Sequence, residues 1–449
     1  MLWIIVAVLG TLMGVLVAVS PLSVAAAVLA ALVVKLATHG LTGTERTRLA
    51  LVLVVAIAVR FGAIAALNVT SARVHSYHSA RVLFGDESYA YDRALRHREL
   101  LQNVRLSKYD YEIVYDTFGR TGYLTAFTWV QAALGPAPYG MRALNAVIFV
   151  AAAAMLFRLA QPVVGGSVSL IGLTVLVCLP SLFFWSISLL KESVYFFLTA
   201  SCLTAGVVLA RSRTAIGSLA ALAVIAVALY FLSDLRPDAL ALTAAPVAIG
   251  LTVVWLGGTR TRLFAAALVG AVLCVMVAVV PSIQRRALAA ITRTAKQHLG
   301  HVFTEGHDYK TLDPAFYAHV QTPATMRFTL TAGEAGRYVA RSIWAFATMP
   351  LPWQIETRRE AAFLPEQIVW YILLITAGAG VWLAWRRDRP FTAILISYVI
   401  VMALVLALTN GNVGTLVRLR GLVTPFLVWF SALGLAAVLV AAMKPRWNA

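Results

Sequence analysis

Long apolar runs, separated by mostly short polar connections, dominate the chain from end to end. The runs recur at lengths of about 18 residues or more, which is what a helix needs to cross about 30 Å of hydrocarbon. Their residues do not alternate between apolar and polar with a period of two, as the strands of a membrane barrel would. The pattern therefore predicts an all-α polytopic membrane protein with about 12 transmembrane helices. We expect spans at about 2–19, 22–37, 49–67, 139–160, 168–186, 189–210, 214–232, 239–256, 263–281, 366–385, 390–409 and 422–443.

Two polar stretches, residues 69–121 and 282–365, are too long for tight turns. The segment after the first, residues 122–136, is apolar but short and is closed by Gly135-Pro136. We interpret it as a re-entrant or interfacial helix at the membrane surface. The proline, glycine and aromatic content of the second stretch predicts short helices packed on that surface. The chain then divides into two extra N-terminal spans and a basic loop at 1–48, a transmembrane core at 49–281 with a first outer loop at 69–136, an outer-face region at 282–365, and C-terminal spans with a tail at 366–449.

Basic residues gather in short connections that all fall on one side of the membrane if the N-terminus is cytoplasmic. This is the positive-inside pattern of membrane proteins. It predicts a multi-pass protein of the plasma (inner) membrane, with both termini in the cytoplasm and both polar regions on the outer face. One pair, Arg418 and Arg420, falls on the outer side, and this exception to the pattern needs a local explanation. The connections that obey the rule contain Arg46 and Arg48, Arg211 and Arg213, Arg260 and Arg262, Arg386, Arg387 and Arg389, and Lys444 and Arg446.

Composition agrees with this class. The chain is 61% hydrophobic and only 12% charged, whereas soluble domains average about 25% charged residues. A net charge of +18 would suggest nucleic acid in a soluble protein, but here orientation rules explain much of it, so the expected partner is a bilayer and not nucleic acid. The N-terminus lacks a basic region and a clear cleavage site, which favours a retained span over a cleaved signal. The three cysteines, at positions 178, 202 and 274, lie inside apolar runs and are expected to be buried core residues.

The first candidate for chemistry lies in the first outer loop. Asp86 and Glu87 follow Gly85, which lets the backbone turn, and precede Tyr89. A carboxylate at the membrane face can accept a proton from a sugar or lipid hydroxyl, with its pKa raised modestly by desolvation. The alternative is that both are solvated loop acids that pair with arginines at positions 81, 93 or 96.

Two tight outer turns carry further charges. Lys191 and Glu192 open the helix that returns into the membrane. Charges so close to hydrocarbon are costly and usually mark a site, although a self-satisfied ion pair, with Glu192 favoured by the helix dipole, explains them as well. Asp234 and Arg236, with Asp238 beyond them, occupy the other turn, where a structural role is equally open.

The stretch from Thr409 to Arg420 suits a phosphate. Gly411 and Gly414 expose backbone N–H groups, and Arg418 and Arg420 follow them. Arginine binds phosphate through two parallel hydrogen bonds, and helix N-termini favour anions. The alternative is that the two arginines reach toward lipid headgroups.

Histidines do not make a convincing metal site. His75 and His78, like His298 and His301, are spaced for one helix face but have no carboxylates at a fixed spacing. We predict no metal site from them and no cofactor. A divalent cation such as Mg²⁺ or Mn²⁺ at Asp86 or Glu87 is left open.

Together these motifs resemble type-C glycosyltransferases, in particular the protein mannosyltransferase and aminoarabinose transferase group. Four features carry the resemblance: Arg60 within a span, the Gly85–Tyr91 stretch, Gly135 followed by Met141-Arg142-Ala143-Leu144-Asn145, and Pro180 with Ser186 and Lys191-Glu192. The resemblance covers about residues 49–443 and is patchy. The two extra N-terminal spans and the short 282–365 region, in place of a large soluble domain, depart from the family pattern.

The resemblance implies catalysis on the outer face with a polyprenyl-phosphate-linked sugar as donor. Asp86 would match the family's first-loop catalytic acid, with Glu87 beside it, and Arg418 and Arg420, with Lys191, would hold the lipid phosphate. The acceptor, whether glycan, lipid or protein, is open. We expect one inverting displacement in which Asp86 takes the proton of the acceptor hydroxyl. Tyr338, Trp344 and Trp353 would either stack on sugar rings or anchor the chain at the membrane interface.

Two other classes compete. An O-antigen-type polymerase or ligase would depend more on arginine and histidine in the outer loops than on Asp86. A transporter or flippase would place charges deep within spans and show repeated halves with broken helices. Arg60 is the only clear deep charge, and no internal repeat is visible.

Overall fold

The computed structural model of this chain describes residues 20–72, 83, 85–116, 121–135, 138–236, 238–302, 330–355, 361 and 363–443. All regular elements of these residues are helices, and they form two compact units, Met1–Ala244 and Ala245–Ala449. Outside the described residues lie the span expected at 2–19, the tail cations Lys444 and Arg446, and the histidines at positions 75, 78, 307 and 319.

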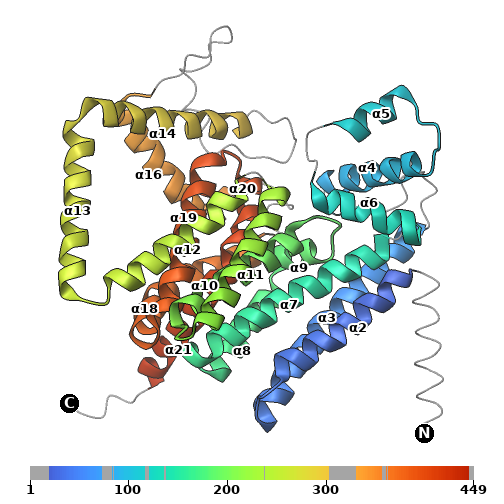
Figure 1. The fold of residues 1–449 in the computed structure, drawn as a ribbon, viewed down its shortest axis with the longest axis horizontal. Coiled ribbons are helices and arrows are strands. Elements are labelled where there is room, and N and C mark those ends of the chain that lie inside the picture. Colours follow the sequence, from blue (N-terminus) through green and yellow to red (C-terminus); the bar gives the residue numbers. More distant parts are fainter. Residues whose placement is uncertain are drawn as a thin grey trace. The chain divides into compact units, whose positions relative to one another are not determined.

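The first unit is built around one long buried helix, α7 (Pro138–Val164). Helices α2, α3, α8 and α10 pack against it. Figure 1 shows α4, α5 and α6 gathered at one end of α2, α3 and α7. The helices of this unit are α2 (Pro21–Thr38), α3 (Gly43–Ala72), α4 (Gly85–Leu101), α5 (Lys108–Tyr115), α6 (Gly122–Leu134), α7, α8 (Gly166–Cys178), α9 (Pro180–Ser186), α10 (Glu192–Arg211) and α11 (Ala215–Leu235), and α12 (Ala239–Leu256) crosses into the second unit.

The second unit combines apolar helices with two amphipathic ones. Helices α14 and α16 pack on each other and on α19. They come from the polar region expected at 282–365, of which residues 303–329, 356–360 and 362 are not described. The helices of this unit are α13 (Arg260–Val279), α14 (Pro281–Val302), α16 (Ala332–Thr348), α18 (Leu364–Arg387), α19 (Arg389–Thr409), α20 (Val413–Leu419) and α21 (Thr424–Met443), with short 3₁₀ turns at Pro352–Gln354 and Arg420–Leu422.

The chain is a helical multi-pass membrane protein. Nine helices of the described residues are long and apolar enough to cross a bilayer, or ten if the bent pair α8 and α9 counts as one span. Most of the 12 predicted spans therefore correspond to a helix of this kind. The span expected at 263–281 coincides with α13, which is not among the nine and has several side chains outside the description. Of the cysteines, Cys202 is buried as expected, whereas Cys178 is exposed on α8.

The span expected at 168–186 is not one straight helix. It is bent by 66° between α8 and α9. Pro180 explains the break, because it has no N–H to donate and its ring clashes with the preceding turn. The buried guanidinium of Arg60 donates hydrogen bonds to Val177 O, at the end of α8, and to Ser186 Oγ, at the end of α9, both at 2.8 Å. The deep charge noted in the sequence thus satisfies polar groups at a broken span, as membrane-buried breaks require.

The segment expected to be re-entrant or interfacial forms α6, which has 13 residues and is too short to cross a bilayer. Thr121 caps its start, because its hydroxyl accepts from Leu124 N at 3.3 Å. Gly135 ends it with a φ of +82°, a conformation that glycine adopts without strain. α6 packs along α4, and this contact gives the region expected to be the first outer loop a folded core.

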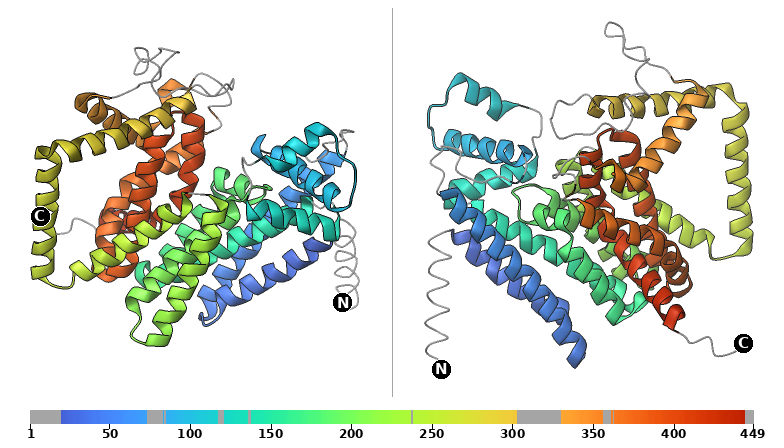
Figure 2. Two further views of the ribbon diagram at one scale, coloured as in Figure 1. Left: turned by 45° about the horizontal axis from the view of Figure 1, so that its top comes forward. Right: turned by 180° about the vertical axis from the view of Figure 1, so that it is seen from behind.

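The closest helix pair of the second unit is α18 with α21, which run side by side (Figure 2). Small residues allow this approach, as is usual in membrane bundles. A Cβ at Gly380 would lie 1.7 Å from Phe430 O, and a Cβ at Gly434 would lie 1.9 Å from Thr376 O. No side chain larger than hydrogen fits at either position.

Replacement of Gly380 by alanine should therefore force α18 and α21 apart. We expect the free energy of unfolding to fall by about 1–3 kcal/mol, the usual cost of overpacking a core. Unfolding by SDS titration in mixed micelles measures it. Gly378→Ala is the matched control on the same helix, because a Cβ there meets no atom within 4 Å. Equal losses in both variants would contradict the close contact.

Candidate active site

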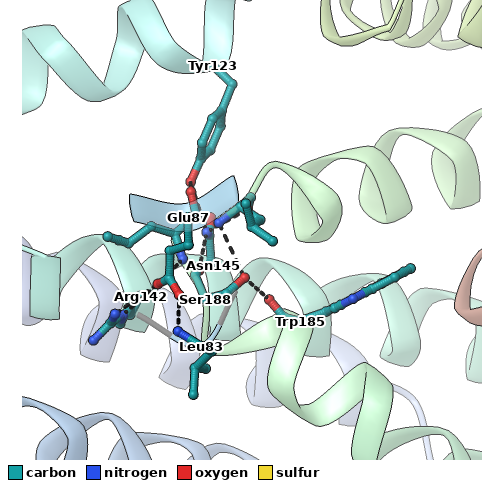
Figure 3. Close-up of polar contacts among 9 residues, drawn as sticks. Leu83, Glu87, Tyr123, Arg142, Asn145, Trp185 and Ser188 are labelled. Atoms are coloured by element: carbon teal, nitrogen blue, oxygen red, sulfur yellow. Dashed lines mark hydrogen bonds and ion pairs between the residues drawn. The ribbon is translucent and has the colours of Figure 1, made fainter. Parts of the chain in front are cut away.

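The polar centre of the first unit is the carboxylate of Glu87, which is 0% exposed (Figure 3). Its Oε1 accepts from Arg142 Nη2 at 2.8 Å and from Leu189 N at 2.9 Å. Its Oε2 accepts from Leu83 N at 2.7 Å. One side chain thus joins the start of α4 to α7 and to the turn between α9 and α10.

The ion pair between Glu87 and Arg142 is fully desolvated, since Arg142 is only 2% exposed. Removal of one partner from such a pair costs about 3–5 kcal/mol, because the other charge is left buried and uncompensated. The two main-chain donors strengthen the arrangement, because a buried carboxylate needs hydrogen bonds as well as a counter-charge. Glu87, a predicted catalytic residue, is therefore held in a structural contact and does not face solvent.

A second buried network fixes the turn between α9 and α10. Asn145, one turn along α7 from Arg142, donates through Nδ2 to Ser188 O at 2.8 Å and to Leu190 O at 3.0 Å. Tyr123 of α6 donates to Leu189 O at 2.9 Å and accepts from the same amide. Burial raises the pKa of Tyr123 above its ordinary value, which keeps the phenol protonated as a donor. Hydrogen bonds from α6 and from α7 therefore fix the position of this turn.

The predicted residues of the two tight turns lie against the same structure. Arg236 and Glu192 form an ion pair at 3.1 Å, and Lys191 Nζ donates to Leu235 O at 2.5 Å. Asp234 accepts from Gly122 N at 2.6 Å, at the start of α6. Burial, with the neighbouring charge of Arg236, lowers the pKa of Lys191. Glu192 is thus paired at the start of α10, as the structural alternative expected, and its partner is Arg236.

Asp86 differs from its neighbour, because it is exposed on the first turn of α4. The helix dipole favours a negative charge at this end. One turn further on, the exposed Tyr89 donates to Asp116 Oδ2 at 2.9 Å. Burial and this hydrogen bond raise the pKa of Tyr89. The structure thus separates the two adjacent carboxylates into a buried anchor and an outward-facing acid.

The predicted phosphate-binding arginines belong to the second unit. Arg420 is 4% exposed and donates to Phe346 O at 2.6 Å, to Gln367 Oε1 at 2.8 Å and to Met349 O. Burial lowers its pKa to about 9. Its hydrogen-bonding groups already bind protein atoms. Arg418 is half-buried on α20.

The aromatic residues expected to stack on sugars or to anchor the chain are divided as well. Tyr338 is buried, with its hydroxyl bonded to Leu408 O. Trp344 and Trp353 are exposed. Within the described part of the chain, no three His, Cys, Asp or Glu side chains are grouped closely enough to hold a metal ion, and the buried His298 packs on the ring of Tyr338.

Sequence reasoning assigned no role to Arg142, Asn145 or Tyr123, which build the centre of this site. A signal was present for the first two, since both belong to the motif Met141–Asn145 on which the resemblance rests. An arginine and an asparagine in an apolar span are costly unless they are bonded inside the protein. Comparisons of the chain with protein-family models, curated proteins and solved structures find no match. Family membership is therefore a prediction of the motifs alone.

The Glu87–Arg142 pair gives a direct stability prediction. Glu87→Gln and Arg142→Met should each lower the free energy of unfolding by about 3–5 kcal/mol, since each leaves one buried charge unpaired. The double variant should lose much less than the sum. Unfolding in mixed micelles measures all three, with Glu112→Gln, on an exposed carboxylate of α5, as control. Strictly additive losses would contradict a direct pair.

Proposed function

We propose that the chain is a membrane glycosyltransferase that moves a sugar from a polyprenyl-phosphate donor to an acceptor on the outer face of the plasma (inner) membrane. The observation that carries the proposal is the placement of Asp86. It is exposed at the N-terminus of α4, next to a buried ion pair that fixes this helix to the transmembrane part of the unit. A carboxylate held in this way is a pre-oriented proton acceptor.

The sites of the other predicted residues support one arrangement. The start of α4, the α9–α10 turn and the end of α11 are joined by contacts of Glu87, Lys191 and Arg236. All are connections that the charge pattern places on the outer side, with both termini in the cytoplasm. Contacts between these connections are expected if all of them lie on the same outer face.

The reaction that this geometry supports is a single inverting displacement. The acceptor hydroxyl loses its proton to Asp86 while its oxygen bonds to the anomeric carbon of the donor. The bond from that carbon to the phosphate oxygen breaks, and its electron pair leaves with the polyprenyl phosphate. Of the predicted cations, Lys191 belongs to the same unit as Asp86 and is the better candidate for the phosphate, whereas the guanidinium of Arg420 is filled by protein acceptors.

A transporter or flippase for lipid-linked sugars is the second candidate, and one observation favours it. Broken helices mark substrate sites in transporters, and α8 and α9 form such a break with Arg60 against it. The hydrogen bonds of Arg60 satisfy the break from within, however, so no substrate is needed to explain the charge. A polymerase or ligase is less favoured, because Arg93, Arg96 and His97 of the outer loop bind α5.

Transfer in vitro from a radiolabelled pool of polyprenyl-phosphate sugars tests the proposal. Asp86→Asn should lower the rate by about 100-fold or more, the usual contribution of a general base, with unchanged abundance in the membrane. Glu99→Gln, on a carboxylate near the other end of α4, should keep full activity. Full activity of Asp86→Asn would exclude this mechanism. No turnover by the wild type, together with lipid-linked sugar movement in vesicles, would favour the transporter.

A further inference from the structure

Three tyrosines of α5, in the loop between α3 and α7, are exposed. On α5, Tyr109 is 67% exposed, Tyr111 39% and Tyr115 62%. The rings of Tyr111 and Tyr115 lie parallel, with an interplanar angle of 2° and their centroids 6.3 Å apart. Aromatic rings of this size are normally covered when a protein offers them a core. Three on one eight-residue helix call for a partner.

The helix that presents them is firmly attached. Arg96 Nε of α4 donates to Asp110 Oδ1 at 2.5 Å, and the hydrogen bond from the Ser107 hydroxyl, together with this contact, lowers the pKa of Asp110. His97 Nε2 lies 3.0 Å from Val114 O, and Arg93 also contacts that carbonyl at 3.3 Å. Val114 is the buried residue of α5. These contacts hold α5 and its tyrosines in a fixed position against α4, which lowers the entropy cost of binding a partner.

Helix α5 is connected to the helix of the proposed catalytic acid through Tyr89. Tyr89 follows Asp86 by one turn of α4, and its hydroxyl bonds to Asp116 Oδ2 at 2.9 Å. Asp116 directly follows Tyr115, the last residue of α5. A path of aromatic rings and carboxylates therefore runs from Asp86 through Tyr89 and Asp116 to the parallel pair Tyr115 and Tyr111.

We propose that this path binds a carbohydrate chain, so that the acceptor of the proposed transfer is a glycan and not a protein or a lipid. The inference rests on the proposed function for its role as acceptor site. Sugar rings carry C–H faces, which pack on the negative faces of aromatic rings, and hydroxyls at their edges, which donate to carboxylates. Parallel tyrosines with acidic neighbours offer both contacts in succession.

The charges of α5 distinguish this partner from a lipid surface. Tyrosines also anchor proteins at membrane interfaces, but anionic headgroups repel carboxylates. Asp110 is paired with Arg96, and Glu112 and Asp116 then outnumber Lys108, the one cation of this helix. A neutral, hydroxyl-rich chain has no such penalty.

Binding to polysaccharide tests the inference separately from transfer. The probe is the polysaccharide released from the envelope of the cells that make the protein, freed of protein and nucleic acid, and added to the full chain in nanodiscs. Tyr111→Leu/Tyr115→Leu removes the rings but keeps apolar bulk, and should weaken binding by about tenfold or more. Tyr111→Phe/Tyr115→Phe keeps the rings and should retain most of the affinity. Periodate-oxidised polysaccharide should not bind.

Two controls separate the possible failures. Tyr230→Leu, on an exposed tyrosine of α11, should bind like the wild type. Asp86→Asn leaves Tyr111 and Tyr115 in place and should still bind through these rings, while its transfer rate falls by about 100-fold or more. Ring-dependent binding without transfer by the wild type would remove the proposed function and leave the glycan site. Wild-type affinity in the leucine pair, or no saturable binding by the wild type, would overturn the site, and easier extraction of the leucine pair from the membrane would identify the rings as interfacial anchors.

Discussion

The carboxylate of Glu87 holds one end of the first unit together. It bonds to Arg142 of α7, to the α9–α10 turn through Leu189 N, and to Leu83 N just before its own helix. In a site without water, a buried carboxylate that lacks a counter-charge and hydrogen bonds strongly destabilises the fold. It therefore fixes the direction of α4 relative to α7 and the α9–α10 turn. Because Asp86 precedes Glu87 by one residue, the anchor also decides where the proposed catalytic acid points.

The same requirement for internal satisfaction governs the membrane-spanning part. Pro180 breaks a span, and the guanidinium of Arg60 bonds to main-chain and side-chain oxygens on both sides of the break. Asn145 does this for the carbonyls of the α9–α10 turn. Polar residues within apolar runs here serve neighbouring segments first. The proposed catalytic role is therefore assigned to Asp86, which is exposed and can reach a substrate.

Hydropathy predicted most of the helices, because the length of an apolar run is a local property of the chain. The order of the spans also predicted that the start of α4, the α9–α10 turn and the end of α11 share one side, and contacts within the first unit join these three. The break at Pro180 was missed, since a proline within an apolar run does not reveal whether the helix merely kinks or turns sharply. The role of Arg142 was missed because its partner is 55 residues away in the chain.

The phosphate site predicted around Arg420 shows how local spacing can leave tertiary contacts unseen. Two glycines and two arginines in an outer connection are typical of anion binding, and local spacing gives no sign that carbonyls of α16 and its C-terminal end surround Arg420. The acidic pair was also ambiguous. Neighbours in the sequence take opposite environments when a helix starts between core and solvent, and only tertiary contacts decide which of Asp86 and Glu87 is buried.

The central claim is that a carboxylate at position 86, on the outer face, takes the proton of the acceptor. Chemical restoration tests this most directly. In a chain whose three cysteines have been replaced and which still transfers sugar, Asp86→Cys is treated from the outside of right-side-out vesicles with iodoacetate or with iodoacetamide. The account predicts that transfer, absent in the untreated variant, returns with the carboxymethyl group and not with the neutral carbamoylmethyl group. Equal recovery with both reagents, or full activity before treatment, would contradict it.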